Sequence, residues 1–385
     1  MSRTADAVEE AGPLAGVRVL DFSRLLPGGA CTRLLQDLGA EIVKVERPVV
    51  GDDLRHEPPM LAEDISAVHQ FLDAGKRSVA LDLKNEDDIG FALALVEHCD
   101  AVIESFRPGV AGKLGIGFEA VNERNPAAVY VSLTGYGQTG PRAHDAGHDI
   151  DYCAYAGVLS TVGEAGPALS GVLAADMTGG TLAATSILAG IIQARTSGRG
   201  SYVDLSLMEA AQWALALPTA QHLADETSWA AGTAMLNGGW PCYRTYACAD
   251  GGHLAVGALE PRFWRRLVEL LGRDDLLERR ADPSAIPELD ALFATRSQAD
   301  WLDLLEGMDA CVAPVKSLAE AVADPHLRAR NGVLDVSGQG WTVAQPACPI
   351  RFSGHDPRRG AAAALDEDRA WARALVARDT AATDG

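Results

Sequence analysis

Residues 17–45 read VRVLDFSRLLPGGACTRLLQDLGAEIVKV, and this stretch decides the fold class. Its first six residues predict a buried strand. Pro27 and the two glycines that follow it open a helix that carries leucines on one face and ends at Gly39, and residues 41–45 predict a second strand. Strand, helix and strand in this order form a βαβ unit, in which the two strands lie parallel in one sheet.

The same alternation continues along the first part of the chain. Further strands are predicted at 78–83, 101–104, 128–133 and 202–205, helices at 86–98 and 180–196, and a long polar loop at 47–64. Such alternation is typical of an α/β fold with a doubly wound parallel sheet. We therefore expect a large α/β domain over residues 1–215.

The alternation ends after residue 217. Short strands are predicted at 242–248 and 253–257, followed by amphipathic helices at 263–271, 287–294 and 298–308. We interpret residues 225–330 as a second, smaller α+β domain, and we expect a surface helix over 361–377.

The composition limits the classes of partner. The 385 residues carry a formal net charge of −20, which argues against nucleic acid but leaves room for a local anion site. No apolar run of membrane-spanning length and no signal-like start are present, so we predict a cytoplasmic protein without membrane contact. Seven scattered cysteines without a C-x-x-C pair indicate reduced thiols, and no spacing typical of a metal site is found.

Two glycine-flanked segments carry the side chains best suited to proton transfer near neutral pH. They are AGHDIDY (146–152), with His148, and AADMTGG (174–180), with Asp176. An isolated histidine would be a core residue, but here glycines and Asp149 surround it, and nearby backbone N–H groups suit an oxyanion. Asp176 precedes the predicted helix, and the sequence alone favours its role as the N-cap over a catalytic one, although the two roles are compatible.

Other candidates have an ordinary structural explanation beside the functional one. The pattern G-x-G-x-x-G at 135–140 follows a strand but does not enter a helix, which favours a glycine loop in an active-site wall over a nicotinamide site. Glu260 precedes a proline at a predicted helix start, where an acidic residue suits the helix dipole. Arg107 follows a predicted strand, so a phosphate contact and a solvated side chain are both open.

Several longer segments resemble the class III CoA-transferase family over about residues 13–352. The segments are PLAGVRVLDFSRLLPGG, LQDLGAEIVKVERP, GKRSVALDLK, ESFRPGV, LTGYGQTGP and SGRGSYVDLSLMEAA. Within this family, AGHDIDY, AADMTGG, MLNGGWPCYRTYACADG and VGALEPRFW resemble the α-methylacyl-CoA racemase branch.

The resemblance implies a fold and an assembly. It implies a doubly wound large domain, to which residues 331–385 return, and an interlocked homodimer whose active sites lie between the large domain of one chain and the small domain of the other. Glu260 of one chain would then meet His148 of the other.

The resemblance also implies a chemistry. His148 and Asp176 would be the two acid/base groups on opposite sides of the α-carbon of a 2-methylacyl-CoA, and the backbone N–H of Asp149 would hold the enolate oxygen. No cofactor is expected beyond the CoA moiety of the substrate, and no metal. The residues expected to contact CoA are Arg47, Lys76, Arg107, Lys113, Gly137 and Gly147.

Two alternatives remain open at this stage. The transferases of the family also carry an aspartate at the position of Asp176 and use it as a nucleophile, whereas they have an apolar residue at the position of His148. A CoA-transferase, or a CoA-thioester binder without catalytic activity, is therefore possible as well. The acyl chain and the pathway are not encoded in a recognisable motif.

Overall fold

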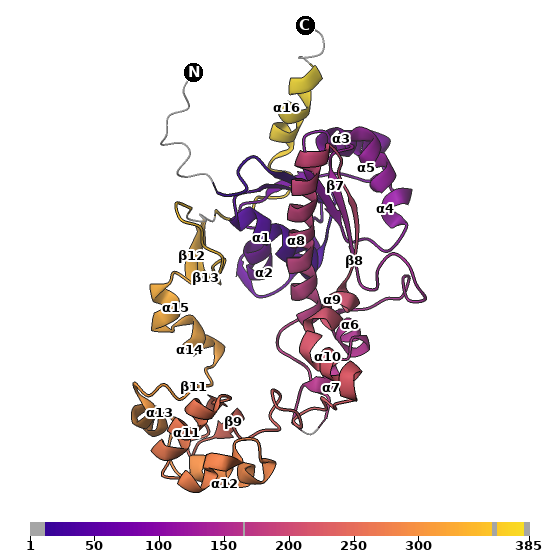
Figure 1. Cartoon of the computed structure of the whole chain (residues 1–385). Coiled ribbons are helices and arrows are strands. Elements are labelled where there is room, and N and C mark those ends of the chain that lie inside the picture. Colours follow the sequence, from indigo (N-terminus) through magenta and orange to yellow (C-terminus); the bar gives the residue numbers. More distant parts are fainter. Residues whose placement is uncertain (1–11, 165, 356–359, 381–385) are drawn as a thin grey trace. The chain divides into compact units, whose positions relative to one another are not determined.

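The computed structural model describes residues 12–164, 166–355 and 360–380, and the chain forms two compact units (Figure 1). Unit 1 consists of the described residues up to 156, of 172–214 and of those from 326 onward; unit 2 consists of 157–171 and 215–325. The sequence predicted the boundary between the two domains at residues 215–225. It did not reveal that the chain already enters unit 2 at 157–171.

A six-stranded sheet forms the centre of unit 1, with strand order β5-β2-β1-β6-β7-β8 and parallel pairing throughout. The strands are β1 (Arg18–Asp21), β2 (Glu41–Glu46), β5 (Arg77–Ala80), β6 (Ala101–Glu104), β7 (Val129–Thr134) and β8 (Tyr202–Ser206). The chain builds outward from β1 to β5 and then returns to β6 on the other side of β1. The predicted α/β class with a doubly wound sheet is confirmed.

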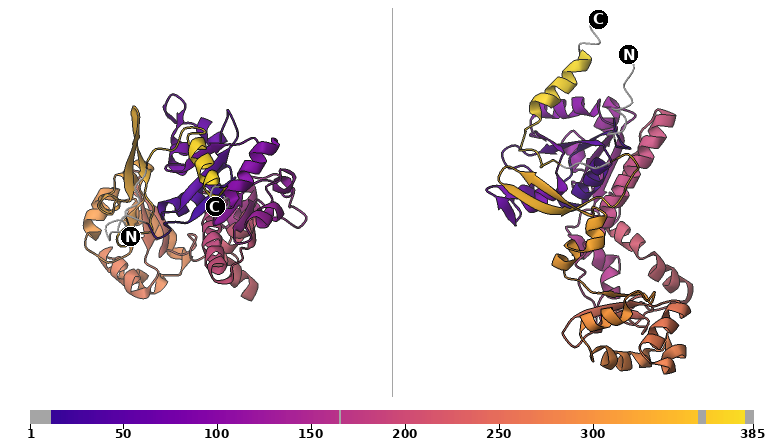
Figure 2. Two further views of the ribbon diagram at one scale, coloured as in Figure 1. Left: turned by 90° about the horizontal axis from the view of Figure 1, so that it is seen from above. Right: turned by 90° about the vertical axis from the view of Figure 1, so that its left-hand side faces the viewer.

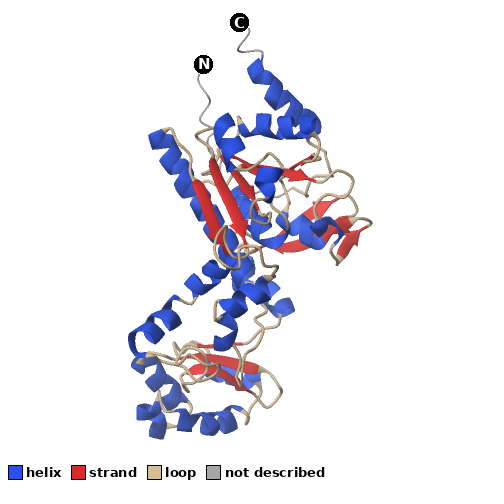
Figure 3. Ribbon diagram, turned by 90° about the vertical axis from the view of Figure 1, so that its right-hand side faces the viewer, coloured by secondary structure: helices blue, strands red, loops and turns tan. Residues whose placement is uncertain are grey.

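Helices cover both faces of this sheet (Figures 2 and 3). On one face, α1 (Leu25–Asp37) packs along α8 (Ala174–Ser197), which also lies on β7. On the other face, apolar side chains of the strands, Leu20, Val43 and Tyr130 among them, form a core with four further helices. These helices are α3 (Glu86–Val96), α4 (Val110–Lys113), α5 (Phe118–Arg124) and α16 (Arg369–Thr380).

Shorter elements complete unit 1. They are a 3₁₀ turn (Asp53–His56), the hairpin β3 (Met60–Ala62) and β4 (Ile65–Ser66), α2 (Ala67–Leu72), α6 (Asp149–Tyr155), α9 (Leu207–Ala214), and the hairpin β12 (Val333–Gly338) and β13 (Trp341–Pro346). The predicted long loop at 47–64 is therefore only partly irregular.

Unit 2 has its own core. Its antiparallel sheet has the order β11-β10-β9, and one face packs on helices through Tyr246, Leu254, Trp264 and Phe293. The strands are β9 (Tyr243–Ala247), β10 (His253–Gly257) and β11 (Val312–Pro314). The helices are α7 (Val158–Thr161), α10 (Ala216–Asp225), α11 (Pro261–Leu270), two 3₁₀ turns (Asp274–Arg279 and Pro283–Ala285), α12 (Ile286–Phe293), α13 (Gln298–Leu305) and α14 (Leu318–Val322), and α15 (Pro325–Ala329) leads back to unit 1.

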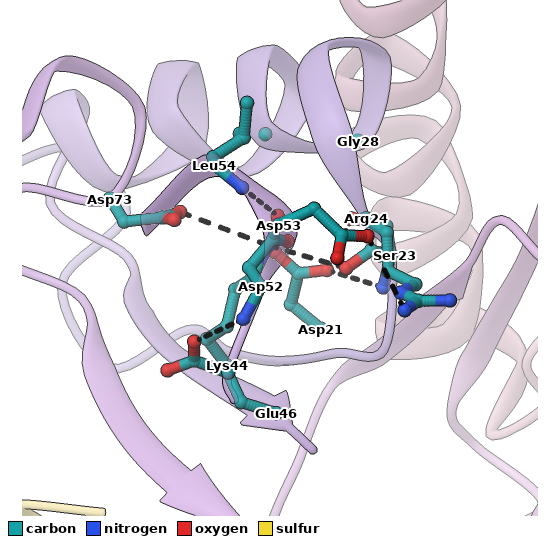
Figure 4. A network of polar contacts seen from close by, with 12 residues as sticks. Asp21, Ser23, Arg24, Gly28, Lys44, Glu46, Asp52, Asp53, Leu54 and Asp73 are labelled. Carbon is teal, nitrogen blue, oxygen red and sulfur yellow. Dashed lines mark hydrogen bonds and ion pairs between the residues drawn. The ribbon is translucent and has the colours of Figure 1, made fainter. Parts of the chain in front are cut away.

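A network of buried charges lies at the carboxyl ends of β1 and β2 (Figure 4). The Lys44 ammonium lies 2.9 Å from the carboxylate of Asp52 and 3.9 Å from that of Asp73. The Lys76 ammonium lies 2.7 Å from Asp73 and 4.0 Å from Asp21. Burial opposes ionisation of Asp73, but the two lysines outweigh it and hold the pKa of Asp73 well below its usual value. The loop after β2 is thereby tied to the sheet.

The C-terminal segment covers the edge strand β5. The backbone N–H of Ser78 donates to the Asp368 carboxylate at 3.0 Å, and that of Ala80 donates to Asp366 at 2.8 Å. These bonds hold residues 361–368 in a non-helical conformation. The prediction of a helix over 361–377 is therefore wrong at its start, since α16 begins at Arg369.

Helix α8 is longer than predicted and lies close to its neighbours. It begins at Ala174 rather than at residue 180, and it is the one described helix whose length and composition would also suit a membrane span. Its glycines are packing positions in unit 1: a Cβ at Gly180 would lie 2.6 Å from the carbonyl oxygen of Pro27, and one at Gly190 would lie 2.6 Å from the side chain of Val129. This packing is that of a core helix.

We expect Gly180→Ala to lower the free energy of unfolding by about 1–3 kcal/mol, because the added methyl group forces α8 away from α1. The control is Gly90→Ala on α3, where a Cβ meets nothing within 4 Å; here alanine should stabilise by about 0.5–1 kcal/mol. Thermal melting of both variants checks the pair, and equal effects would contradict the close approach of the two helices.

Candidate active site

A cavity of about 540 Å³ opens at the carboxyl edge of the sheet in unit 1. It lies where the strand order reverses between β1 and β6, the position at which open α/β sheets bind ligands. Its wall comes from the segments after β1, β6 and β7 and from the beginnings of α6 and α8. The lining residues used below are Arg24, Leu25, Arg107, Gly135, Tyr136, Gly147, His148, Asp149, Tyr152 and Asp176.

The two predicted acid/base residues both line this cavity. His148 immediately precedes α6; its backbone N–H donates to the Asp151 carboxylate at 2.9 Å, and the residue is exposed. Asp176 is the third residue of α8 and is partly buried. The interpretation of Asp176 as an N-cap is wrong, because the helix begins two residues before it and Leu173 occupies the cap position.

The environment of Asp176 favours its neutral form. Burial, the largest cause, and the neighbouring Asp149 carboxylate raise the pKa of Asp176 to about 6, while His148 acts in the opposite direction. A carboxyl group with this pKa exists in both protonation states close to neutral pH. It can therefore serve as an acid and as a base.

Asp149 contacts the start of α8. Its Oδ1 accepts the backbone N–H of Ala175 at 2.8 Å and that of Asp176 at 3.1 Å. Its own backbone N–H is the first of α6, and none of the described residues accepts from it. This N–H directly follows His148 in the chain, and its role as an oxyanion donor stays a prediction.

An aromatic wall stands beside His148. The Tyr152 hydroxyl donates to the carbonyl oxygen of Gly147 at 2.6 Å, and the rings of Tyr136 and Tyr152 meet edge to face at 5.1 Å. A Cβ at Gly135 or at Gly147 would approach the Tyr152 ring to 2.5 Å or 2.7 Å, so both positions require glycine. Gly147 lines the cavity as expected, whereas Gly137 shapes the loop with a φ of 82° and is not among the lining residues.

Two of the basic residues that were predicted to contact CoA line cavities. Arg107 is exposed in the wall next to the acid/base residues, and no hydrogen bond or ion pair joins its guanidinium to another described residue. Arg47 lines a second cavity of about 430 Å³ over β1, β2 and β5, and it forms an ion pair of 2.5 Å with Asp53. Arg24 and Phe106 line both cavities, so the two adjoin.

The other two predicted cations lie elsewhere. Lys76 is buried, and its ammonium is taken by Asp73 at 2.7 Å and by the Thr32 hydroxyl at 2.8 Å. Lys113, the last residue of α4, is exposed and lines neither cavity. Phosphate binding is therefore better supported for Arg107 and Arg47 than for the two lysines.

Glu260 belongs to unit 2. It occupies the N-cap position of α11, directly before Pro261, as its sequence context indicated. Its expected pairing with His148 stays a prediction.

Sequence reasoning missed two residues at the switch point. Arg24 follows β1 and donates its backbone N–H to the Ser105 hydroxyl after β6 at 2.9 Å, which joins the two strand ends. Leu25 has a φ of 63°, a left-handed conformation that leucine rarely adopts and that concentrates at functional sites. A basic residue just past the first strand was the available signal for Arg24.

The model of CoA-transferase family III matches residues 14–369. The chain belongs to this family. It is an enzyme of the transferase and racemase group.

Both racemases and CoA-transferases of family III are similar to the chain. It is 36% identical to the alpha-methylacyl-CoA racemase of Mus musculus, over 87% of this chain and 85% of the relative. It is 30% identical to the succinyl-CoA:glutarate CoA-transferase of Mus musculus, over 89% and 81%. The crystal structure of a CaiB/BaiF family protein from Brucella suis matches with a TM-score of 0.84 at 29% identity, covering 95% of this chain and 100% of that one.

We expect Asp176→Asn to stabilise the folded protein at neutral and higher pH. Because the folded state raises the pKa of this carboxyl above its unfolded value, the ionised form costs stability above about pH 6, and the cost disappears below about pH 4. The gain should be about 1–3 kcal/mol at pH 8 and smaller at pH 4.5. Denaturant unfolding at the two pH values measures it. Asp303→Asn, which removes the same charge from an exposed position on α13, should change little at either pH.

Proposed function

We propose that this enzyme is a racemase or epimerase that inverts the α-carbon of 2-methylacyl-CoA thioesters. The observation that carries the proposal is the presence of an imidazole, His148, and a carboxyl group with a pKa of about 6, Asp176, in one cavity. A nucleophilic aspartate alone would suffice for transfer of CoA, whereas inversion by proton transfer requires two acid/base groups.

The proposed reaction moves one proton off and one proton onto the same carbon. A thioester acidifies its α-proton because sulfur donates poorly into the carbonyl. His148 removes this proton, the electron pair moves onto the carbonyl oxygen to give an enolate, and protonated Asp176 delivers a proton to the opposite face. The reverse direction exchanges the two roles. A carboxyl pKa close to that of imidazole suits a reaction whose two ends are nearly equal in energy.

The backbone N–H of Asp149 is the proposed donor to the enolate oxygen. It stands at the first position of α6, where the partial positive charge of the helix end also favours an anion. Such a donor acts mainly where charge develops, so it lowers the barrier more than it strengthens substrate binding.

We assign the CoA moiety to the two adjoining cavities along the carboxyl edge of the sheet. Arg107, in the wall of the first cavity, and Arg47, in the wall of the second, are the proposed contacts of its phosphates, which the pantetheine arm separates from the reacting carbon. We propose that the enzyme needs no cofactor besides this CoA moiety, and that it works in the cytoplasm as a homodimer in which Glu260 of one chain orients His148 of the other.

A CoA-transferase is the second candidate, since transferases and racemases match the chain at similar identity. In that reaction the Asp176 carboxylate would attack the thioester carbonyl, the C–S bond would break, and CoA would leave as the thiolate. The CoA thiolate would then attack the Asp176 carbonyl of the acyl-aspartyl anhydride, which gives an aspartyl-CoA thioester and releases the first acid as its carboxylate. A second carboxylate would attack this thioester and expel the CoA thiolate, which then takes up the new acyl group from the second anhydride and frees Asp176.

Incubation of the enzyme with one enantiomer of a 2-methylacyl-CoA in D₂O tests the proposal. We expect incorporation of deuterium at C2, measured by mass spectrometry, together with loss of enantiomeric purity, measured by chiral separation. The proposal fails if neither occurs over several acyl chains while CoA passes to an added free acid and hydroxylamine traps an acyl group on Asp176.

Single-base variants sharpen this test. His148→Ala and Asp176→Asn should each lower the rate of inversion by about 10² or more, because each removes one of the two proton carriers. The remaining base should still exchange the α-proton of one substrate enantiomer for deuterium, with retention of its configuration. The enantiomer that exchanges should differ between the two variants. Exchange into the same enantiomer by both variants would contradict opposite placement of the bases.

We expect Arg107→Ala to raise KM for the CoA ester about tenfold or more and to change kcat less, because a phosphate contact is equally present in the ground and transition states. Lys113→Ala is the comparison; it removes a cation that lines neither cavity and should change KM less than about threefold. Steady-state kinetics at two salt concentrations measures both, and a larger effect at Lys113 would reverse the assignment.

A further inference from the structure

The chain does not pass directly from α6, which His148 precedes, to α8, which contains Asp176. Residues 157–171, which separate α6 from α8, belong to unit 2. The chain thus leaves unit 1 directly after the helix that follows His148 and returns only shortly before Asp176. Chain connectivity alone does not hold the two groups at a set separation.

The Asp149 carboxylate bridges this gap. It accepts from the backbone N–H groups of Ala175 and Asp176 at 2.8 and 3.1 Å, over a sequence separation of 26 and 27 residues. The residue in the cap position of α8, Leu173, supplies no side-chain hydrogen bond. Asp149 therefore does for α8 what a local N-cap does for other helices.

We propose that the Asp149 side chain is the positioning residue of the site: it locks the start of α8 to the start of α6 and thereby sets the geometry between His148 and Asp176. Its backbone adjoins His148, and its carboxylate is bonded to the backbone of Asp176 itself. One residue thus touches both partners of the proposed proton transfer. This inference rests on the proposed function for its catalytic meaning and on the hydrogen bonds alone for its structural meaning.

The second carboxylate oxygen is held as well. The thiol of Cys153, one turn further along α6, lies 3.5 Å from Oδ2. Burial, the largest cause, raises the pKa of this thiol to about 11, so it remains protonated and able to donate at neutral pH. The carboxylate is accordingly fixed at both oxygens, which makes it a rigid link between the two helices.

The negative charge of Asp149 has an effect separate from its hydrogen bonds. It raises the proton affinity of Asp176, in the same direction as burial. Other ionisable groups around Asp176 are His148, Tyr152 and Cys153 from the α6 segment and Arg107 from the segment after β6. Asp149→Asn leaves all four of these residues in place and alters a direct contact only at Cys153, so charge and geometry can be separated by substitution.

Three variants make the separation. Asp149→Asn keeps an acceptor oxygen for the two N–H groups and removes the charge. Asp149→Ala removes both. Asp100→Asn is the matched control, because the Asp100 carboxylate also accepts a backbone N–H, that of Arg18 at 2.8 Å, but lies at the opposite edge of the sheet, directly before β6.

Three measurements are made on the full chain: thermal melting, the titration of Asp176 followed by the ¹³C signals of its carboxyl group, and the pH dependence of α-proton exchange. Asp149→Asn should melt close to the unaltered protein, and the titration of Asp176 and the matching limb of the exchange profile should both move to lower pH. Asp149→Ala should melt a few degrees lower and lose inversion by about tenfold or more. The control should change neither titration nor profile.

Each failure has a distinct meaning. Full inversion activity and unchanged melting in Asp149→Ala would overturn the positioning role, and an unmoved Asp176 titration in Asp149→Asn would overturn the separate effect of the charge. Absence of proton exchange in the unaltered enzyme would instead refute the proposed function, while melting and titration would still decide whether Asp149 links the two helices.

Discussion

The reversal of strand order between β1 and β6 is the constraint on which this site depends. Because the chain leaves these two neighbouring strands toward opposite faces of the sheet, a crevice opens between their carboxyl ends. The N–H of Arg24 bridges the two strand ends, and Arg107 follows the second of them. Helices α6 and α8 then bring His148 and Asp176 to the same crevice, so binding groups and acid/base groups come from different parts of the chain.

The buried charges beside this crevice illustrate how position determines the role of a residue. Lys44 and Lys76 share Asp73, and Lys44 also binds Asp52 in the loop after β2. Buried ion pairs add little net stability compared with apolar packing, but they tolerate few alternative arrangements of their neighbours. Their effect here is to hold a polar loop in one conformation at the rim of the second cavity, where Asp52 is itself a lining residue.

Much of the fold could be predicted because its signals are local. In residues 17–45, the apolar runs predict the two strands, and Gly39 marks the end of the helix between them. None of these signals depends on distant parts of the chain. The start of α8 could not be predicted in this way, since its cap, Asp149, is supplied from another helix. The burial of Lys76 was missed because its segment is basic and polar and because Thr32, a partner 44 residues away in the sequence, reaches it only in the folded sheet. His148 and Asp176 were found through their glycine-flanked context and the family resemblance, whereas nothing local signals that the Asp149 side chain joins them.

The covering of β5 by the C-terminal segment has a consequence for how the chain folds. An uncovered edge strand offers unpaired N–H and C=O groups to any other strand, including one from a second chain. Asp368 and Asp366, which accept the backbone N–H groups of Ser78 and Ala80, are synthesised 290 and 286 residues after the residues that they cover. A sheet that forms before this segment has been synthesised has an open edge at β5, and an edge of this kind can pair with another chain.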